Sequence, residues 1–363
     1  MKTKPAIHQV METCSYGDAI GNMGLNHRAE LRKAGYMSEI YAGKIHPLLS
    51  GDVKTIPQFR EDLKKDDIII YHFSIGSDIS RLLHSLPHRL VLYYHNITPP
   101  EFFRGFHDVL MRQCFLGREE LKSFAQRTDL AVAPSDYNRL ELVAYGFRKT
   151  ATIPVPVNRE RLLKDHSISV EKIYNDRKAN FLFVGRVIPN KKVEDVIKAF
   201  HLYKQQFNPS SRLFITGSYK SFEGYLDWLR RLVKKLRLRE DVIFTGHVSD
   251  EELAAYYKLS DVFLMLSEHE GFCVPLIEAF IWDIPVIAFD AGAVGETMRG
   301  GGILLAKKDY AMIAELVDKL MTSNVYRQAV IASQQKALIK YEKESGNKAL
   351  PVIIKRFLAG TLD

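Results

Sequence analysis

The chain has 363 residues, of which 46% are apolar, and it carries a formal net charge of +8 at pH 7. Its three widely spaced cysteines give no disulfide framework or metal motif, and no apolar run approaches the roughly 20 residues that span a bilayer. The positive charge favours anionic partners, namely nucleic acid, an anionic membrane surface or phosphate-bearing substrates.

The length, about twice that of a typical domain, predicts two packed domains. No apolar leader precedes the first strand-like run, so we expect a cytoplasmic protein, at most peripheral at the inner face of a membrane. Because no nucleic-acid-reading motif accompanies the charge, nucleic acid ranks last among the partners. The sequence leaves the oligomeric state open.

Short apolar runs alternate with helical patterns along the whole chain, which predicts parallel sheets of the doubly wound kind. In the first half we expect strands at residues 6–10, 39–42, 68–73, 90–94, 130–133 and 152–155. The polar stretch 157–178 reads as a linker. In the second half we expect strands at residues 181–184, 213–216, 242–245, 262–265, 286–288 and 303–305.

These patterns predict an α/β protein with two Rossmann-like domains, residues 1–165 and 166–340, facing each other across a cleft. Residues 341–363 read as a C-terminal helix that packs back on the first domain. Ligands bind such sheets at the carboxyl ends of the strands, so function should lie on the loops that follow the strands.

Two loops of the first half carry candidate residues. Gly17, Asp18 and Gly21 lie between a strand and a helix, where glycine permits close approach of the backbone to a phosphate. His95 follows the strand at 90–94. A histidine at a strand end is more often hydrogen-bonded scaffold than catalyst, but its place at the inferred cleft favours a functional role.

Residues 101–127 mix aromatic and aliphatic side chains with arginine and lysine, a composition that allows a basic amphipathic surface. One interpretation is a helix pair that faces the core with its charges in solvent, and we favour it. The other is a patch that engages anionic lipid or a lipid-linked acceptor. The same choice applies to residues 228–239.

In the second half, the strand at 181–184 is followed by Gly185, Arg186 and, after four residues, Lys191. Arginine offers a fixed fork to phosphate oxygens and lysine a mobile charge, so the pair suits a diphosphate leaving group. The alternative is a solvated strand end.

The segment 267–279 follows a buried-type strand directly. Pro275 suits the first turn of a helix, so we expect the backbone amides of residues 272–276 to form an anion site. Glu270 should lie on the loop and Glu278 one turn into the helix, where the two carboxylates reach different parts of one polyol ligand. Separately, each could be a solvated acid or an acid that offsets the helix dipole.

Together, Gly185-Arg186-x4-Lys191, the segment 245–253 and Glu270-x7-Glu278 resemble the retaining family 4 glycosyltransferases of GT-B architecture. The match covers nearly the whole second half. The resemblance implies that Arg186 and Lys191 hold the donor diphosphate, that Glu270 contacts the donor sugar, and that Glu278 binds ribose hydroxyls.

The resemblance extends to further donor-side positions. It implies that the backbone near Val248 reads the nucleobase and that Gly271, Phe272, Cys273 and Val274 line the donor site. Cys273 stands where the family often has glycine, and we interpret it as a packing residue. The turn at 290–296 resembles a structural Gly-rich turn.

In the first half, the resemblance implies that the loop of Gly17, Asp18 and Gly21 closes over the donor phosphates. It places His95 beside the anomeric carbon. The first domain would then admit the acceptor, and the second would bind the nucleotide sugar.

The implied activity is transfer of a hexosyl group from GDP-mannose or a UDP-hexose to a glycan or glycolipid acceptor, with retention and without a metal or other cofactor. Cell-surface polysaccharide synthesis is the expected setting. The rivals are a sugar-nucleotide epimerase, a phosphorylase and a catalytically idle nucleotide-sugar-binding subunit.

Overall fold

Both halves of the chain fold as parallel sheets flanked by helices. The structure, a computed structural model, describes residues 4–15, 18–164 and 166–362. Packing divides the chain into two units. The first comprises Met1–Pro100, Val109–Pro156 and Lys343–Asp363, and the second comprises Glu101–Asp108 and Val157–Glu342.

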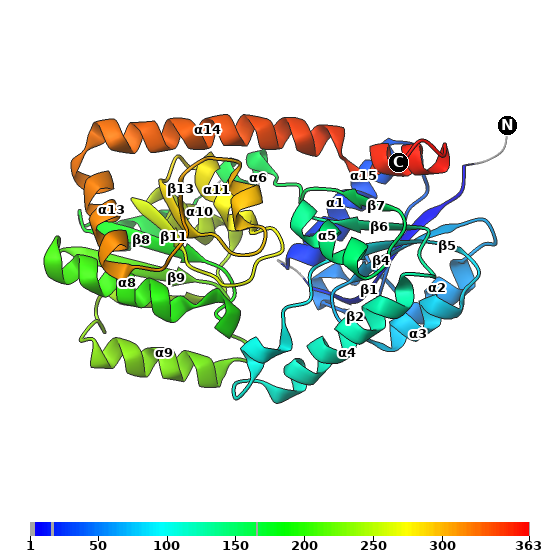
Figure 1. Cartoon of the computed structure of the whole chain (residues 1–363), viewed down its shortest axis with the longest axis horizontal. Helices are drawn as coiled ribbons and strands as arrows, with labels where there is room; N and C mark the ends of the chain where they lie inside the picture. The colour runs from blue at the N-terminus through cyan, green and yellow to red at the C-terminus, as the bar shows by residue number, and fades with distance from the viewer. Residues whose placement is uncertain (1–3, 16–17, 165, 363) are drawn as a thin grey trace. The chain divides into compact units, whose positions relative to one another are not determined.

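The first unit is built on a seven-stranded parallel sheet with the order β3-β2-β1-β4-β5-β6-β7. Its strands are β1 (Ile7–Cys14), β2 (Ile40–Ile45), β3 (Lys54–Thr55), β4 (Ile68–Phe73), β5 (Arg89–Tyr94), β6 (Leu130–Ala133) and β7 (Thr150–Thr152). Its helices are α1 (Ala19–Lys33), η1 (Pro47–Leu49), α2 (Ile56–Asp62), α3 (Asp78–Ser85), α4 (Asp108–Phe124), α5 (Asp136–Ala144) and α15 (Leu350–Leu358). The last of these, α15, packs against α1 (Figure 1).

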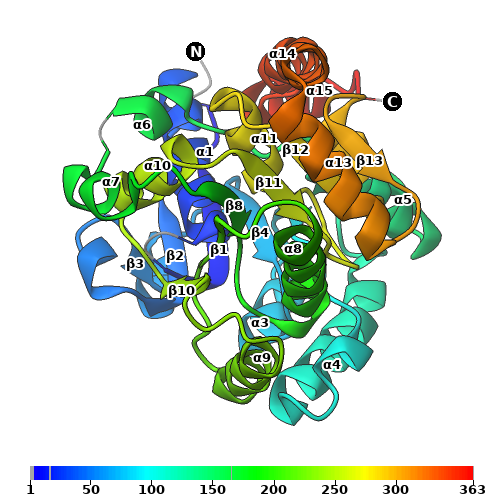
Figure 2. The ribbon, with the colours of Figure 1, turned by 90° about the vertical axis from the view of Figure 1, so that its left-hand side faces the viewer.

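The second unit is built on a six-stranded parallel sheet with the order β10-β9-β8-β11-β12-β13. Its strands are β8 (Ala179–Val184), β9 (Ser211–Thr216), β10 (Val242–Gly246), β11 (Val262–Met265), β12 (Val286–Phe289) and β13 (Ile303–Leu305). Its helices are α6 (Arg159–Lys164), α7 (Ile168–Tyr174), η3 (Pro189–Lys191), α8 (Val193–Gln206), α9 (Glu223–Lys235), α10 (Asp250–Lys258), α11 (Val274–Ile281), α12 (Val294–Met298) and α13 (Tyr310–Thr322). In this sheet α8 and α13 lie on one side and α10 and α11 on the other (Figure 2).

Two elements cross the division between the units. The short helix η2 (Pro100–Phe103) enters the second unit at Glu101, and the long helix α14 (Asn324–Asn347) begins in the second unit and passes to the first at Lys343. None of the helices in the described part of the chain combines the length and apolar character that crossing a bilayer requires.

Most of the central strands are largely apolar because helices cover both faces of each sheet. Every residue of β4 and of β9 is buried. Local signals set the helix ends: Ser249 and Glu252 form a capping box at the start of α10, and Asp309 caps α13 by accepting from the amides of Ala311 and Met312.

The two sheets confirm the predicted α/β class with Rossmann-like domains, and each expected strand overlaps an observed one. The smallest overlap is at β7, which ends at Thr152, whereas the prediction ran from 152 to 155. Pro154 and Pro156 lack the N–H that a ladder needs, so pairing stops there. The segment 157–178 contains α6 and α7, and it groups with the second unit.

Candidate functional site

Two loops of the second unit are joined at the carboxyl ends of the neighbouring strands β8 and β11. The amide of Glu268 donates to the carbonyl of Asn190 at 2.9 Å, and the Asn190 side-chain amide donates to the carbonyl of His269 at 3.2 Å. Between these contacts, Lys191 Nζ donates to both carboxylate oxygens of Glu270, at 2.7 and 2.6 Å. The structure therefore brings together Lys191 and Glu270, two residues singled out from the sequence.

The Glu270 carboxylate is nearly buried, with a side chain 5% exposed against 20% for Lys191. The loop that carries Glu270 packs against the glycine-containing turn after β12. Gly292 has φ +61, and a Cβ there would stand 2.4 Å from the Glu270 carbonyl oxygen. The amide of Ala293 donates to that same oxygen at 2.9 Å. This packing supports the structural interpretation of the turn at 290–296.

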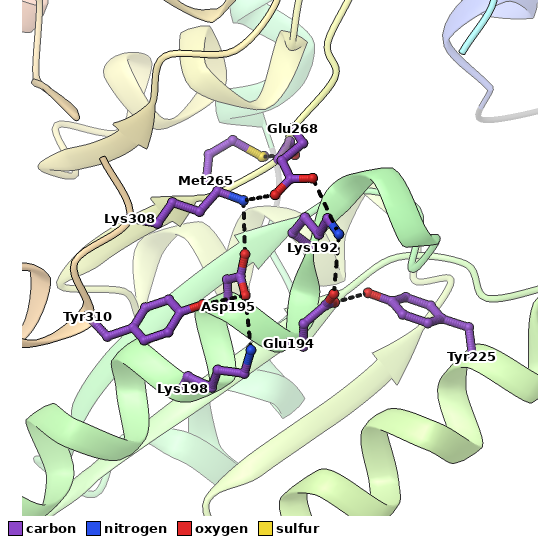
Figure 3. Close-up of polar contacts among 10 residues, drawn as sticks. Lys192, Glu194, Asp195, Lys198, Tyr225, Met265, Glu268, Lys308 and Tyr310 are labelled. Atoms are coloured by element: carbon purple, nitrogen blue, oxygen red, sulfur yellow. Dashed lines mark hydrogen bonds and ion pairs between the residues drawn. The ribbon is translucent and has the colours of Figure 1, made fainter. Parts of the chain in front are cut away.

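Further ion pairs connect the residues that neighbour Lys191 and Glu270 in the sequence (Figure 3). Lys192 Nζ lies 3.3 Å from Glu268, and Lys308 Nζ donates to Glu268 and to Asp195, each at 2.9 Å. The hydroxyl of Tyr310 donates to Asp195 at 2.6 Å. These contacts tie the loops after β8, β11 and β13 into one network, which fixes the backbone that carries Lys191 and Glu270.

The pKa values of two acids in this region, Asp195 and Glu194, are shifted in opposite directions. Burial alone would raise the pKa of Asp195, but hydrogen bonds from Tyr310 and Lys308 outweigh burial and lower it. Burial raises the pKa of Glu194, against a hydrogen bond donated by Tyr225. Asp195 therefore remains ionised at pH values below the usual carboxyl range, which preserves its ion pair with Lys308.

Gly185 and Arg186 follow β8 directly. The amide of Gly185 donates to the Thr216 carbonyl at 2.9 Å. Arg186 has an exposed side chain, and its guanidinium carbon lies 5.9 Å from the centre of the Phe222 ring. The Arg186 guanidinium therefore lies at the surface near the Phe222 ring, and the same loop after β8 carries Lys191.

Helix α11 begins at Val274 with Pro275 in its first turn, as the sequence predicted. The preceding residue, Cys273, has φ +75, a left-handed conformation that favours glycine and costs other residues energy. Its thiol is buried, and burial together with the Glu270 carboxylate raises its pKa well above the usual value. A neutral, buried thiol fits a packing residue and gives no activated nucleophile.

Phe272 and Gly271 complete this loop. The hydroxyl of Thr297 donates to the Phe272 carbonyl, and the Phe272 side chain is buried. The buried Phe272 side chain and the bond to its carbonyl therefore hold in place the backbone that leads into α11.

Glu278 lies one turn into α11 and is half-buried. The hydroxyl of Tyr257, from α10, donates to Glu278 Oε2 at 2.7 Å. Burial and the neighbouring carboxylate raise the pKa of Tyr257 far above 10, so it acts as a donor that orients Glu278. Val248 follows β10, the edge strand, which is separated from β8 by β9.

In the first unit, Asp18 is the residue before α1 and Gly21 lies in its first turn. A Cβ at Gly21 would stand 2.4 Å from the Ser15 carbonyl oxygen, so this turn requires glycine. Gly17 lies outside the described residues. His95 follows β5 and is half-buried, with Nε2 2.8 Å from His72 Nδ1. Burial lowers the pKa of His95 to about 3, so its imidazole is neutral.

Sequence reasoning missed the residues that hold the site together: Asn190, Lys192, Tyr257, Glu268 and Lys308. Lys192 and Glu268 stand one and two positions from Lys191 and Glu270. Their proximity in sequence was a usable signal, because residues beside two interacting loops often pair as well. Tyr257 and Lys308 gave no such signal, since their partners lie far away in the sequence.

Two Rossmann-like parallel sheets, with a cationic and acidic loop pair at the strand ends of the second, are the components of the GT-B architecture of glycosyltransferases. Residues 166–344 match the family model described as glycosyl transferases group 1. The second unit therefore carries a domain of the glycosyl transferases group 1 family.

Its relatives are distant. It is 28% identical over 270 residues to an uncharacterized 41.2 kDa protein in the cps region of Klebsiella pneumoniae, which covers 70% of this chain and 69% of that protein. It is 25% identical over 230 residues to the GDP-mannose-dependent alpha-(1-6)-phosphatidylinositol monomannoside mannosyltransferase of Mycobacterium tuberculosis. That match covers 59% of this chain and 58% of the relative.

Among solved structures, Anabaena HepE in complex with UDP and glucose matches with a TM-score of 0.75. The sequence identity is 18% and 99% of each chain is covered, so this likeness bears on the fold.

Proposed function

We propose that the chain transfers a hexosyl group from a nucleotide diphosphate sugar to a glycan or glycolipid acceptor, with retention of anomeric configuration and without a metal ion. The observation that carries this proposal is the joined pair of loops after β8 and β11. It places an ammonium against a nearly buried carboxylate, on a loop that also carries an exposed arginine.

Each group has a role in this proposal. Arg186, Lys191 and the amides that open α11 bind the donor diphosphate and offset the charge that grows on it as it leaves. Glu270 accepts hydrogen bonds from the donor sugar while it holds Lys191. Glu278, oriented by Tyr257, accepts from ribose hydroxyls. Val248 contributes backbone contacts to the nucleobase.

Retention without an activated nucleophile suggests attack from the front face. The acceptor hydroxyl enters beside the departing diphosphate, forms the new glycosidic bond as the sugar–phosphate bond breaks, and passes its proton to a phosphate oxygen. Stabilising the leaving group is then the main catalytic task, and it falls to Arg186 and Lys191.

Two relatives give the proposal its biological setting. The Mycobacterium tuberculosis relative uses GDP-mannose and acts on a glycolipid, and the Klebsiella pneumoniae relative lies in a cps region. These names support a hexose donor and a cell-surface glycan or glycolipid acceptor for this chain.

Incubation of the full chain with labelled GDP-mannose and UDP-hexoses, an acceptor panel and EDTA tests the function. We expect label on an acceptor, an unchanged anomeric configuration in the product, and the same rate with and without the chelator. Label recovered as an epimer or a sugar phosphate would favour the rival enzymes. Donor binding by calorimetry with no transfer or hydrolysis would favour an idle subunit.

For the acceptor side, we propose that α4 contacts an anionic membrane surface, which is the interpretation not favoured from the sequence alone. Its apolar side chains divide into two sets. Leu121 and Phe124 are buried in the core, whereas Phe115 and Leu116 are each 56% exposed. Exposed Arg112 lies on the same helix, so the outward apolar pair has a basic neighbour that anionic headgroups attract.

Liposome flotation tests this contact. We expect the wild-type protein to float with vesicles that contain anionic lipid and to remain at the bottom with neutral vesicles. The double substitution Phe115→Ser with Leu116→Ser should reduce flotation severalfold. Val325→Ser, at an apolar position of α14 that is 83% exposed, serves as the matched control. Equal flotation of both variants would exclude α4 as the contact.

A further inference from the structure

A chain of hydrogen bonds runs through the core of the first unit to His95. It connects three neighbouring strands, because β1, β4 and β5 are adjacent in the sheet. Gln9 of β1 has Oε1 2.8 Å from His72 Nε2, and His72 of β4 has Nδ1 2.8 Å from His95 Nε2. Gln9 is fully buried and His72 is 1% exposed, so water does not compete for these contacts.

The hydrogen bond from Gln9 to α1 determines which atom donates and which accepts in each of the other bonds of this series. Gln9 Nε2 donates to the carbonyl of Gly24 in α1 at 3.0 Å, and a carbonyl can only accept. The amide group of Gln9 therefore turns its oxygen toward His72, which must carry its proton on Nε2. His72 Nδ1 then accepts, so His95 must donate from Nε2. A neutral imidazole with its proton on Nε2 has a lone pair on Nδ1.

The surroundings keep both imidazoles neutral. Burial lowers the pKa of His72 well below 6.5 and that of His95 to about 3, and the neighbouring histidines act in the same direction on each. The rings of His72 and His95 lie edge to edge and nearly coplanar, with an interplanar angle of 22° and centroids 5.1 Å apart, and Tyr93 stacks on His95 at 4.8 Å. The stack fixes the ring planes, and the hydrogen bonds fix the protons.

We propose that Gln9 and His72 are positioning residues that lock His95 in the Nε2–H tautomer, so that Nδ1 acts as an obligate hydrogen-bond acceptor for a sugar hydroxyl. This rests on the proposed function and on the sequence-based expectation that His95 lies beside the anomeric carbon of the donor sugar. Nδ1 of the locked ring accepts from a hydroxyl and repels a carboxylate. The site therefore selects a neutral hexose that carries a hydroxyl at the contacted carbon over a deoxy sugar or a uronic acid.

Nuclear magnetic resonance of the full chain labelled with 15N-histidine reports the histidine tautomers independently of any activity measurement. Long-range correlations between ring nitrogens and ring protons should show His72 and His95 protonated on Nε2 in the wild type. Gln9→Met keeps the volume and removes the acceptor that orders the chain. In this variant we expect mixed tautomers at both rings, with kcat lowered about tenfold and the donor KM unchanged.

His27→Phe is the matched control. His27 lies in the same buried stack, 5.4 Å from the Tyr93 centroid, and in the described part of the chain neither of its ring nitrogens has a hydrogen-bond partner. A phenyl ring should preserve the packing, the tautomer of His95 and kcat. If Gln9→Met does not fold, His72→Phe supplies the same break in the chain.

Protonation of wild-type His95 on Nδ1, or an unchanged tautomer in the folded Gln9→Met protein, would overturn the lock. A changed tautomer with unchanged kcat would overturn the positioning role. Either result leaves transfer by the wild-type enzyme as a separate measurement, so failure of this inference is distinguishable from failure of the proposed function.

Discussion

Replacement of Arg186 by alanine is expected to lower kcat by about 10²–10³-fold while the protein stays folded. In the proposed mechanism its guanidinium stabilises the charge that develops on the departing diphosphate. The side chain is exposed, so its loss removes little packing, and surface substitutions of this kind change stability by only about 0.5 kcal/mol. Turnover with the preferred donor and thermal unfolding together measure both parts of the expectation.

Arg230→Ala is the matched control for charge. Arg230 lies on α9 with a side chain 56% exposed, and it pairs with Asp227 at 3.5 Å. Its removal should leave kcat within twofold of the wild type. Equal kinetics for a folded Arg186→Ala protein and the wild type would remove Arg186 from the site.

Separation of Lys191 from Glu270 is expected to affect both stability and donor binding. Glu270→Gln leaves the ammonium without its charge partner in a largely buried site. Breaking a buried pair costs about 3–5 kcal/mol, and we expect the lower end because the Lys191 side chain keeps 20% exposure. Lys191→Met should leave Glu270 buried and unpaired at a similar cost, with donor affinity reduced in both variants.

A double-mutant cycle with Lys191→Met and Glu270→Gln measures the interaction energy between the two side chains separately from the effect of each single substitution. The double variant should recover part of the stability that each single change removes, because no unpaired charge remains. Donor binding should not recover, since both roles are lost. As a reference, the exposed pair Lys122–Glu119 should give a coupling of only about 0.2–0.5 kcal/mol. A coupling as small as this between Lys191 and Glu270 would mean that they do not act as a unit.

Much of the fold was predictable because parallel sheets that are covered on both faces require continuous apolar strands. The runs at 68–73 and 262–265 coincide with β4 and β11 in both bounds. The two-residue strand β3 (Lys54–Thr55) carries no such pattern, because one lysine and one threonine at a sheet edge look like loop. The boundary of β7 was missed because two prolines interrupt a run that is otherwise apolar.

The sequence also placed Lys191 and Glu270 in one site, since strands of one parallel sheet end at the same edge. It could not show that the two side chains bind each other, because 79 residues separate them. The chain from Gln9 through His72 to His95 was invisible for the same reason. The orientation of the buried Gln9 side chain depends on its hydrogen bond to the Gly24 carbonyl, and that carbonyl belongs to another element, α1.

In the proposed mechanism the donor diphosphate binds between Arg186, Lys191 and the amino terminus of α11. A crystal structure of the full chain with its intact nucleotide sugar shows where the diphosphate binds. We expect diphosphate oxygens within hydrogen-bond distance of the Arg186 guanidinium, Lys191 Nζ and the α11 amides, with ribose hydroxyls at Glu278. Diphosphate bound elsewhere, with the Lys191–Glu270 contact and the α11 amides untouched by ligand, would contradict the mechanism.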